Sequence, residues 1–578
     1  MRKFLYLFLS LALLVSCSGP KCPDGEYTLH LYTTNDVHGR YFDSLYVSNK
    51  TKPSLLAVNH IIDSVRNAVG QENVILVDAG DCLQGDNAAY YFNYVDTQTK
   101  HLYARMVEYM KYDAIAVGNH DIETGHPVYD RIVKEMKVPF LAANARRVSN
   151  SLPYFQEYVM LDKNGLKVAV IGFTNPNIKA WLAPSIWSGI EFKSLLPFVQ
   201  ETVDRVQKKE KPDVTVVLVH SGTGKGDGSI YESQGLDLYN SLEGVDFLVC
   251  SHDHSPYIAS KDGIALINSG SHCRNVGHGV ITVQVKDGKV VSRKISAENV
   301  PVNKNLVDRQ MGEYFRADYE AVKTFTKKEI GTLETELRTR DSYMGMCDYM
   351  NLIHTLSLSC TPAQLSMAAP LTFDGIVKPG TLLYNDLFTI YPFENQLFVV
   401  KLSGQEVKDY LEYSYDNWIN SIKTSDEHLL KISQRPDYRT GVMGWSFVNR
   451  AYNFDSCGGL VYDVDVTRPM GERISIKSMA DGSSFSLDDT YNVAMTSYRA
   501  SGGGKIMSEG AGVCTDNIAE RVVAYHKEIR NILYDYLMEH GTINSSVIGN
   551  PAVIGHWDFV PSELARPAIE RDMNLVFK

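Results

Sequence analysis

Five short polar clusters in the chain have residue types that could hold metal ions. They are Asp36-Val37-His38, Gly80-Asp81, Gly118-Asn119-His120-Asp121, Val219-His220 and Ser251-His252-Asp253-His254. A single histidine at the end of a strand is more often a hydrogen-bonded structural residue than a ligand. Carboxylate, amide and imidazole groups gathered in one place, however, suit a site for two divalent ions with one carboxylate between them.

The elements that must position these clusters are strands. Apolar runs rich in β-branched residues cover residues 28–34, 74–78, 114–117, 168–173, 214–219, 247–250 and 264–267. Such runs are typical of strands buried on both faces, and the stretches between them, such as 54–68 and 102–110, show helical spacing. Ligands in open α/β sheets bind beyond the carboxyl ends of the strands. We therefore predict an α/β fold in which the five clusters converge on one sheet edge.

In order and residue type, the five clusters resemble the signature of the calcineurin-like metallophosphoesterases. The resemblance implies a four-layer αββα sandwich and, as cofactors, two divalent ions, for which Zn, Mn, Co and Fe are all suitable. It puts Asp36, His38 and His254 on one ion, Asn119, His220 and His252 on the other, and Asp81 between them. Ser251 departs from the family, which has glycine there, but this departure removes no ligand.

His120 has a catalytic role in this resemblance. In the family, the corresponding histidine stabilises the transition state or protonates the leaving oxygen, aided by a carboxylate. In the nearest relatives that carboxylate stands three residues later, which is Glu123 here, and Asp121 competes for the same role. A histidine near neutral pH can accept or donate a proton at little cost, so His120 and Glu123 are the expected catalytic pair.

The C-terminal half resembles the nucleotide-binding domain of the 5′-nucleotidase family, so the resemblance covers essentially the whole mature chain. The most recognisable stretch, 378–397 with 402–407, is assigned to the scaffold. Aromatic side chains on the loops 452–459 and 497–504 are expected to sandwich a nucleobase, with core packing as the alternative. We expect Phe454 or Tyr452 in the first position and Tyr498 in the second. Arg499 is expected to meet a phosphate or ribose hydroxyl, or else solvent.

One stretch distinguishes between branches of that family. Typical 5′-nucleotidases have a Gly-rich loop ending in Arg where this chain has Leu365-Ser366-Met367-Ala368-Ala369-Pro370-Leu371. This pattern resembles the 2′,3′-cyclic-nucleotide 2′-phosphodiesterase/3′-nucleotidase branch. We therefore expect a phosphohydrolase for 2′,3′-cyclic or 3′-nucleotides, in which water between the metals attacks the phosphate in line. The alternatives are a 5′-nucleotidase or UDP-sugar hydrolase and, remotely, a lipoprotein that binds a ligand without turnover.

The N-terminus has the pattern of an export signal. Arg2 and Lys3 precede an apolar run over 4–15, which is too short to span a bilayer. The following Leu14-Val15-Ser16-Cys17 resembles a bacterial lipobox, which implies cleavage after residue 16 and acylation of Cys17. The alternative is an ordinary signal peptide with an incidental cysteine. We expect an exported protein held by lipid on a bacterial membrane, facing the periplasm or the cell surface.

Length and composition set the remaining expectations. A chain of 578 residues exceeds a single core, so we expect a signal peptide at 1–16, a phosphoesterase domain at 25–304, a linker helix at 305–340 and an α+β domain at 341–578. The apolar share of 44% is ordinary for a globular protein, which excludes disorder. A net charge of −11 argues against a nucleic-acid polymer as partner. We expect a monomer whose substrate is a nucleotide.

Overall fold

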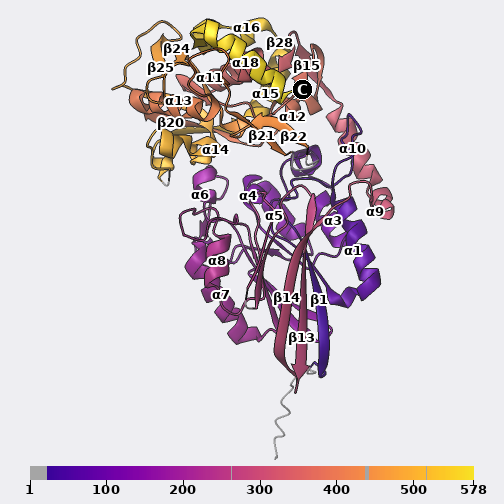
Figure 1. The fold of residues 1–578 in the computed structure, drawn as a ribbon. Helices are drawn as coiled ribbons and strands as arrows, with labels where there is room; N and C mark the ends of the chain where they lie inside the picture. Colours follow the sequence, from indigo (N-terminus) through magenta and orange to yellow (C-terminus); the bar gives the residue numbers. More distant parts are fainter. Residues whose placement is uncertain (1–21, 262, 437–441, 516) are drawn as a thin grey trace, which may run out of the picture.

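The computed structural model describes residues 22–261, 263–436, 442–515 and 517–578. The predicted signal peptide and Cys17 therefore lie outside the described residues. The chain forms two domains that are connected by α9 (Arg309–Tyr314) and α10 (Arg316–Thr326), at the right of Figure 1. Within the described ranges, no helix is both long enough and apolar enough to cross a membrane.

The first domain is built on two six-stranded sheets. One has the order β14-β13-β1-β2-β3-β4, with β14 (Lys289–Pro301), β13 (Asn275–Lys286), β1 (Gly25–Thr34), β2 (Val74–Asp78), β3 (Ala114–Ala116) and β4 (Phe140–Leu141). The other has the order β11-β12-β10-β9-β7-β6, with β11 (Tyr257–Lys261), β12 (Ile264–Asn268), β10 (Phe247–Val249), β9 (Val214–Val219), β7 (Leu166–Phe173) and β6 (Tyr158–Lys163). The strands β1 to β4 are parallel, as are β12, β10, β9 and β7, so the carboxyl ends in each set share one edge.

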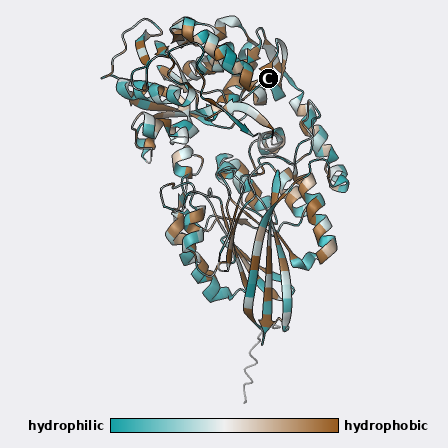
Figure 2. Cartoon of the chain, in the orientation of Figure 1, coloured by the Kyte–Doolittle hydropathy of each residue, from teal (hydrophilic) through white to brown (hydrophobic). Residues whose placement is uncertain are grey.

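Three apolar layers hold this domain together. Leu31 and Val77 of the first sheet pack against Val170 and Leu218 of the second, which forms the central core. Helices α1 (Leu55–Val69), α3 (Leu102–Tyr109) and α5 (His126–Glu135) cover the outer face of the first sheet, and α7 (Leu195–Glu210) and α8 (Gly235–Ser241) cover that of the second. Figure 2 shows the apolar residues gathered on the strands between these helices. The predicted α/β class and its four layers are confirmed.

The second domain combines a mixed five-stranded sheet with smaller sheets and helices. The larger sheet has the order β23 (Ser456–Gly458), β17 (Leu365–Ala368), β26 (Thr490–Thr496), β20 (Gln396–Ser403) and β27 (Val522–Glu528). Two three-stranded sheets contain β25 (Ile474–Met479), β24 (Leu460–Asp465) and β29 (Gly555–Val560), and β19 (Gly380–Leu383), β15 (Glu329–Leu333) and β28 (Thr542–Ile543). The main helices are α11 (Asp348–Ser359), α12 (Tyr384–Ile390), α13 (Gly404–Trp418), α15 (Ile529–His540) and α18 (Ser562–Val576).

The segment 305–340 differs from the single helix that we expected. After α9 and α10 the chain enters β15 and β16 (Leu337–Arg338), which belong to sheets of the second domain. Ile330 and Leu333 are both buried, and their spacing of three fits a helix as well as a strand with an irregularity. The register shift beside Gly331 lets both side chains reach the core, and this shift explains the wrong prediction for the end of the segment.

The two domains contact each other on both sides of the sheet edge. Tyr90 ends α2 (Asn87–Tyr90), and its hydroxyl donates a hydrogen bond to Asn531 Oδ1 at 3.3 Å. Its ring lies 5.7 Å from that of Tyr384 in α12. On the other side, the backbone N–H of Ala183 donates to Gln396 Oε1 at 3.1 Å. Gln396 lies in the stretch that we assigned to the scaffold, so this stretch also contacts the first domain.

Candidate active site

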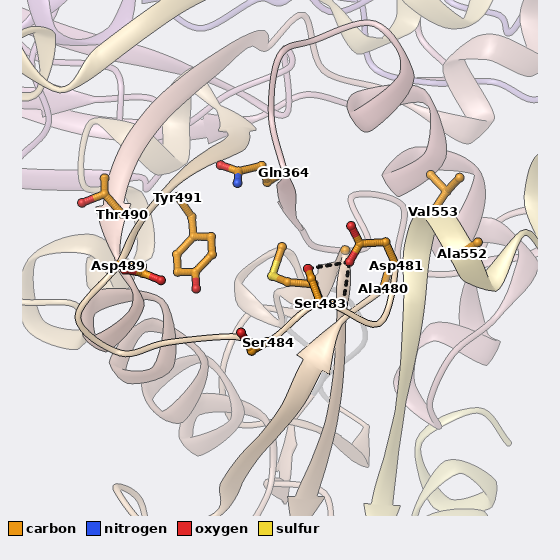
Figure 3. A pocket seen from close by; sticks show the side chains of 12 residues that line it. Gln364, Ala480, Asp481, Ser483, Ser484, Asp489, Thr490, Tyr491, Ala552 and Val553 are labelled. Atoms are coloured by element: carbon orange, nitrogen blue, oxygen red, sulfur yellow. Dashed lines mark hydrogen bonds between the residues drawn. The ribbon is translucent and has the colours of Figure 1, made fainter.

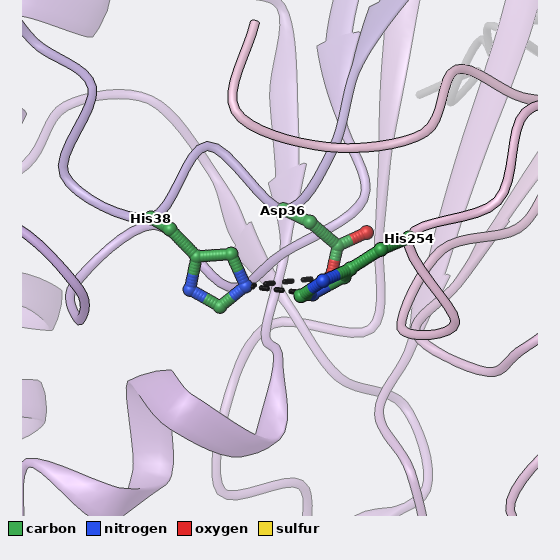
Figure 4. A group of neighbouring side chains, drawn as sticks. All are labelled: Asp36, His38 and His254. Carbon is green, nitrogen blue, oxygen red and sulfur yellow. Dashed lines mark hydrogen bonds and ion pairs between the residues drawn. The ribbon is translucent and has the colours of Figure 1, made fainter. Parts of the chain in front are cut away.

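Asp36, His38 and His254 point toward one another at the edge of the first domain (Figure 4). Each offers a ligand atom within 4.8 Å of the other two. The Nε2 atoms of His38 and His254 are 2.9 Å apart, and Asp36 Oδ1 lies 3.5 Å from His254 Nε2. Two imidazole nitrogens this close need a proton or a cation between them. The donor set and its spacing therefore fit a divalent cation.

A second group lies beside the first. The ligand atoms of Asp81, His220 and His252 are also within 4.8 Å of one another. Asn119 Oδ1 is 3.0 Å from His220 Nε2 and 3.0 Å from His252 Nδ1, so the amide oxygen joins this group. The structure thus brings the seven sequence-predicted ligands to one region, with Asp81 grouped with the second set rather than between the two.

Asp81 belongs to the second group, and its two carboxylate oxygens have different contacts. Its Oδ1 accepts a hydrogen bond from the backbone N–H of His120 at 2.8 Å. Its Oδ2 is buried without a hydrogen-bond partner among the described residues, 3.1 Å from His220 Nε2. A buried carboxylate oxygen with no partner is costly. A cation at this point would satisfy it, so the orphaned oxygen supports a metal site.

The electrostatics of the cluster also fit cations. Burial lowers the pKa of His38 well below its ordinary value and that of His252 to about 3, so both imidazoles are neutral, the form that binds metal. Burial, with the Asp81 carboxylate nearby, raises the pKa of Asp36 well above its ordinary range. Around Asp81, burial is outweighed by His220 and His120, which hold its pKa well below the ordinary range. Divalent cations would relieve the repulsion between the two carboxylates.

The backbone is strained where it presents the ligands. Five of the seven have a positive φ angle, namely Asp36 (48°), His38 (48°), Asp81 (62°), His252 (74°) and His254 (57°). Each such residue costs about 1–3 kcal/mol, and such residues gather at functional sites. The approach of the loops is also tight, because a Cβ added to Gly118 would overlap the Asp81 carboxylate. The fold therefore maintains an unfavourable local geometry that aims the ligands at one region.

His120 and Glu123 lie side by side at this edge, in α4 (Asn119–Glu123). The Nδ1 atom of His120 is 2.5 Å from Glu123 Oε2. Burial favours the neutral imidazole, but Asp81 and Glu123 outweigh it and raise the pKa of His120 to about 10. Asp121 does not compete for this position, because its two oxygens accept backbone N–H groups at 2.8–3.0 Å, from Gly118, Asp81, Cys82 and Leu83.

Ser251, the departure from the family pattern, supports a ligand. Its hydroxyl lies 3.0 Å from His220 Nδ1 and donates to the carbonyl of Ala79 at 2.9 Å. The same carbonyl lies 2.8 Å from His220 Nδ1. These contacts fix the orientation of the ring and leave Nε2 facing the metal region, as partners behind a metal ligand commonly do.

Phe454 does not occupy the base-binding position that we expected. It is 1% exposed and lies in the core of the second domain, where its ring stacks on Trp418 at 5.5 Å. A base has no access to either face of a ring packed in this way. Tyr452, the alternative for the first base-stacking position, is 37% exposed and therefore remains the candidate.

Tyr452 and Tyr498 form an exposed pair on the second domain. We call this pair the tyrosine corner, a name for these two side chains that is unrelated to the tyrosine corner of β-sandwich domains. Tyr498 lies in α14 (Ser497–Ala500) and is 39% exposed. The two ring centroids are 6.3 Å apart and the ring planes meet at 82°, so the rings meet edge to face. A Cβ added to Gly503 would lie 2.6 Å or less from several atoms of the Tyr498 ring, so one face of this ring is covered by backbone. The rings thus form a corner rather than a parallel sandwich.

Arg499 is a buried residue and does not meet solvent or a phosphate. It is 3% exposed, and its Nε and Nη2 donate to Asp455 Oδ2 and Oδ1 at 2.9 and 2.7 Å. Sequence analysis could not distinguish this role, because the partner Asp455 lies on another loop. The expected contact with substrate is therefore withdrawn.

Two residues at the site were missed by sequence analysis. Trp181 ends α6 (Ile178–Trp181), and its ring stacks on His252 at 5.1 Å. The signal was available, since α6 follows the carboxyl end of β7 as the polar clusters follow other strands. Glu394 comes from the second domain, is buried, and has its Oε1 bonded to Arg530 at 2.6 Å. Its charge contributes to the raised pKa of His120, and no local pattern could have indicated this.

A separate cavity of about 500 Å³ lies in the second domain (Figure 3). Its lining includes Gln364, Asp481, Ser483 and Tyr491. It contains none of the seven candidate ligands of the first domain, which we call the metal edge: Asp36, His38, Asp81, Asn119, His220, His252 and His254. The Ser483 hydroxyl donates to Asp481 Oδ1 at 2.6 Å, so the lining pairs its own polar groups. We assign no role to this cavity.

Comparison with known proteins agrees with the two domains. Residues 29–256 match the calcineurin-like phosphoesterase family, and residues 329–509 match the C-terminal domain of 5′-nucleotidase. The chain therefore combines a calcineurin-like phosphoesterase domain with a 5′-nucleotidase C-terminal domain, and it is a hydrolase of phosphoester bonds. This assignment favours a hydrolase over the alternative of a binding protein without turnover.

Individual relatives are distant but extend over most of the chain. The chain is 25% identical, over 94% of its length, to the trifunctional nucleotide phosphoesterase YfkN of Bacillus subtilis, of which it spans only 40%. It is 25% identical to a 2′,3′-cyclic-nucleotide 2′-phosphodiesterase/3′-nucleotidase of Salmonella typhimurium, covering 82% of this chain and 81% of the relative. The solved 5′-nucleotidase precursor of Thermus thermophilus has the same fold, with a TM-score of 0.57 and 19% identity, over 93% of this chain and all of the other.

Proposed function

We propose that the protein is an exported nucleotide phosphohydrolase that acts on 2′,3′-cyclic nucleotides and 3′-nucleotides. The observation that carries this proposal is the placement of a metal-type ligand cluster and the His120–Glu123 pair in one domain with the tyrosine corner on the domain that contacts it. The relative from Salmonella typhimurium, which is named for this double activity, supports the choice of substrate.

The seven ligands are proposed to hold two divalent cations. The ions would supply Lewis-acid stabilisation of the phosphoryl charge and a more acidic water. Asp36, His38 and His254 would hold one ion and Asn119, His220 and His252 the other, with Asp81 as the proposed shared ligand. Ser251 holds the His220 ring, and Asp121 holds the backbone of the Asp81 loop. Zn, Mn, Co and Fe remain the proposed identities, because imidazole, amide and carboxylate ligands suit all four.

His120 is proposed to protonate the leaving oxygen. A ribose oxygen is strongly basic when it leaves, so a proton donor lowers the barrier. Glu123 holds Nδ1 of His120, so that Nε2 is the nitrogen left to face the substrate. The short contact also fixes the orientation of the ring. This division of roles matches that of an acid and the carboxylate that orients it.

The stretch 365–371 favours this activity over 5′-nucleotidase activity. Leu365 to Ala368 form β17, all four residues are buried, and the stretch contains no cationic side chain. The arginine that typical 5′-nucleotidases carry here is therefore missing. A 5′-nucleotidase from Vibrio cholerae is nevertheless 24% identical over 67% of the chain, so 5′-nucleotidase or UDP-sugar hydrolase activity is the second candidate.

A turnover panel tests the proposal. The purified protein is assayed with 2′,3′-cyclic AMP, 3′-AMP, 5′-AMP and a UDP-sugar, and its metals are measured by mass spectrometry. We expect the first two substrates to have the highest kcat/KM, with two divalent ions per chain. Preference for 5′-AMP or the UDP-sugar would overturn the substrate assignment, and turnover without divalent metal would overturn the mechanism.

Export and acylation at Cys17 complete the proposal. The basic and apolar pattern of residues 1–16 and the lipobox support them. Metabolic labelling with a radioactive fatty acid should mark the protein in the membrane fraction, and Cys17→Ser should abolish the label. Equal labelling of this variant would show that the anchor lies elsewhere.

A further inference from the structure

Arg499 uses its whole guanidinium group to join two loops. Its Nε and Nη2 donate to the two oxygens of Asp455. Its Nη2 also donates to the Tyr452 carbonyl at 2.8 Å, and its Nη1 donates to Asn453 Oδ1 at 3.2 Å and to the Gly503 carbonyl. A guanidinium has five N–H donors, and five acceptors are present. Four of these acceptors lie in residues 452–455, across from the loop that carries Arg499.

This arrangement joins the two exposed tyrosines through the backbone. Arg499 directly follows Tyr498 in the chain, and it holds the backbone of Tyr452 by a hydrogen bond to its own carbonyl. The relative placement of the tyrosine corner therefore depends on one side chain beneath it. A buried ion pair is weak evidence of a contribution to stability. We therefore look for another role for the hydrogen bonds that Arg499 makes.

The partner of Arg499 is itself fixed to the core. Asp455 Oδ2 accepts a hydrogen bond from the Tyr410 hydroxyl, and the Asp455 carbonyl accepts one from the Ser414 hydroxyl at 2.8 Å. Both donors lie on α13. The loop over residues 452–455 is thus attached to a rigid helix, and Arg499 transmits that position to the loop over 497–504.

The backbone packs closely around the Arg499 guanidinium at Gly504. A Cβ added to Gly504 would overlap Asn453 Oδ1 and crowd Arg499 Nη1. Gly504 also has a φ of 69°, which other residues rarely adopt. Lysine has three donors around one point charge and cannot copy the planar fork, so Arg499→Lys keeps the charge and removes most of the bonds.

We propose that Arg499 is a positioning residue that sets the preference for nucleotides over other phosphoesters by holding Tyr452 and Tyr498 in the edge-to-face arrangement in which they would contact a base. The inference rests on the proposed function, because it takes the tyrosine corner as the base-binding surface. It gives Arg499 no contact with substrate. The expected effect of losing it is on KM for substrates that contain a base, with little effect on kcat.

The experiment measures kcat and KM of Arg499→Lys for a 3′-nucleotide and for a simple aryl phosphate. We expect KM for the nucleotide to rise about tenfold, since base stacking is worth about 1–3 kcal/mol. The kcat for both substrates and the KM for the aryl phosphate should stay within about twofold of the unaltered protein. Equal changes on both substrates, or no change on either, would overturn the inference.

Arg473 offers a matched control for a merely structural role. It is equally buried, at 2% exposed, and its guanidinium bonds to Asp416 and to the carbonyls of Tyr415 and Ile419. It lies in the same domain, and none of these bonds reaches residues 452–455 or 497–504. Arg473→Lys should lower the thermal midpoint without changing the ratio of the two KM values. A similar change in that ratio in both variants would show that general loosening of the domain is the cause.

A milder variant keeps the test informative if Arg499→Lys does not fold. Asn453→Ala removes one acceptor of Arg499 and should raise KM for the nucleotide in the same direction by a smaller factor. Tyr452→Ala should cost less in the Arg499→Lys background than alone, because the pair is then already displaced. If the unaltered protein hydrolyses the aryl phosphate but no nucleotide, the proposed function has failed, whereas unchanged nucleotide KM in all variants defeats only the role of Arg499.

Discussion

The metal edge and the tyrosine corner depend on the surrounding protein in different ways. At the metal edge the ligands themselves are mostly buried, and five of them sit on strained backbone. At the tyrosine corner the rings are exposed, and a buried arginine below them fixes their placement. Where the backbone is rigid, as at the metal edge, the contacting residues determine what the site can do. Where loops carry the site, as at Tyr452 and Tyr498, the buried residues beneath the loops also determine the position of the contacting side chains.

The largest effect should come from breaking the metal edge at Asp81, the proposed shared ligand. Asp81→Asn keeps the volume and removes the charge that would face both ions, so we expect loss of bound metal and of measurable hydrolysis. Metal content by mass spectrometry and turnover of a 3′-nucleotide check this. His120→Ala is the contrast: it should keep both metals and lower kcat by about 10²- to 10⁴-fold. Full turnover in His120→Ala would contradict its assignment as the acid.

A smaller effect should follow from Glu123→Gln, and it should depend on pH. Asp81 and Glu123 outweigh burial and raise the pKa of His120 to about 10. Of the two carboxylates, Glu123 is the one that binds no cation in the proposed site, so its charge favours the protonated imidazole there. Removing the Glu123 charge lowers that pKa, so the alkaline limb of the kcat profile should move to lower pH by about one unit or more. Asp130→Asn is the control, because Asp130 contacts His126 at 3.2 Å in the same way. A profile that shifts equally in both variants would exclude a specific role for Glu123.

The smallest effect on activity should come from a substitution in the tyrosine corner. A substitution in the core below the corner should change stability instead. Tyr498→Ala should raise KM for a nucleotide about five- to tenfold and spare an aryl phosphate, because only the nucleotide stacks. Phe454→Ala should instead lower the free energy of unfolding by about 3–5 kcal/mol, since its ring fills the core. Steady-state kinetics checks the first variant, and denaturant titration checks the second. A selective KM change in Phe454→Ala would restore Phe454 as a base-binding residue.

The sequence was sufficient where local pattern and chemistry coincide. The β-branched runs became the central strands, because strands buried on both faces need nothing but apolar side chains. The ligand clusters then followed from strand ends, since parallel strands bring their carboxyl ends to one edge. Glu123 was expected beside His120 from the family resemblance, and the structure places it there because three residues along a helix put two side chains on one face.

The sequence was insufficient where two loops had to be placed against each other. Phe454 and Tyr452 are two residues apart, and packing against distant rings such as Trp418 and Phe447 decides which of the two is buried. The partner of Arg499 is 44 residues away, so its burial could not be read from its neighbours. Glu394 reaches the catalytic pair from the other domain, and this proximity depends on how the domains meet.

Asp121 joins four amides from the two loops that carry Asp81 and His120. The proposed shared ligand and the proposed acid are therefore held in one hydrogen-bonded unit, and we expect their separation to change little between substrates. A change of substrate must then be accommodated elsewhere, in the loops around Tyr452 and Tyr498. Variants selected for new substrates should accordingly accumulate in the second domain, while the bond that is broken stays the same.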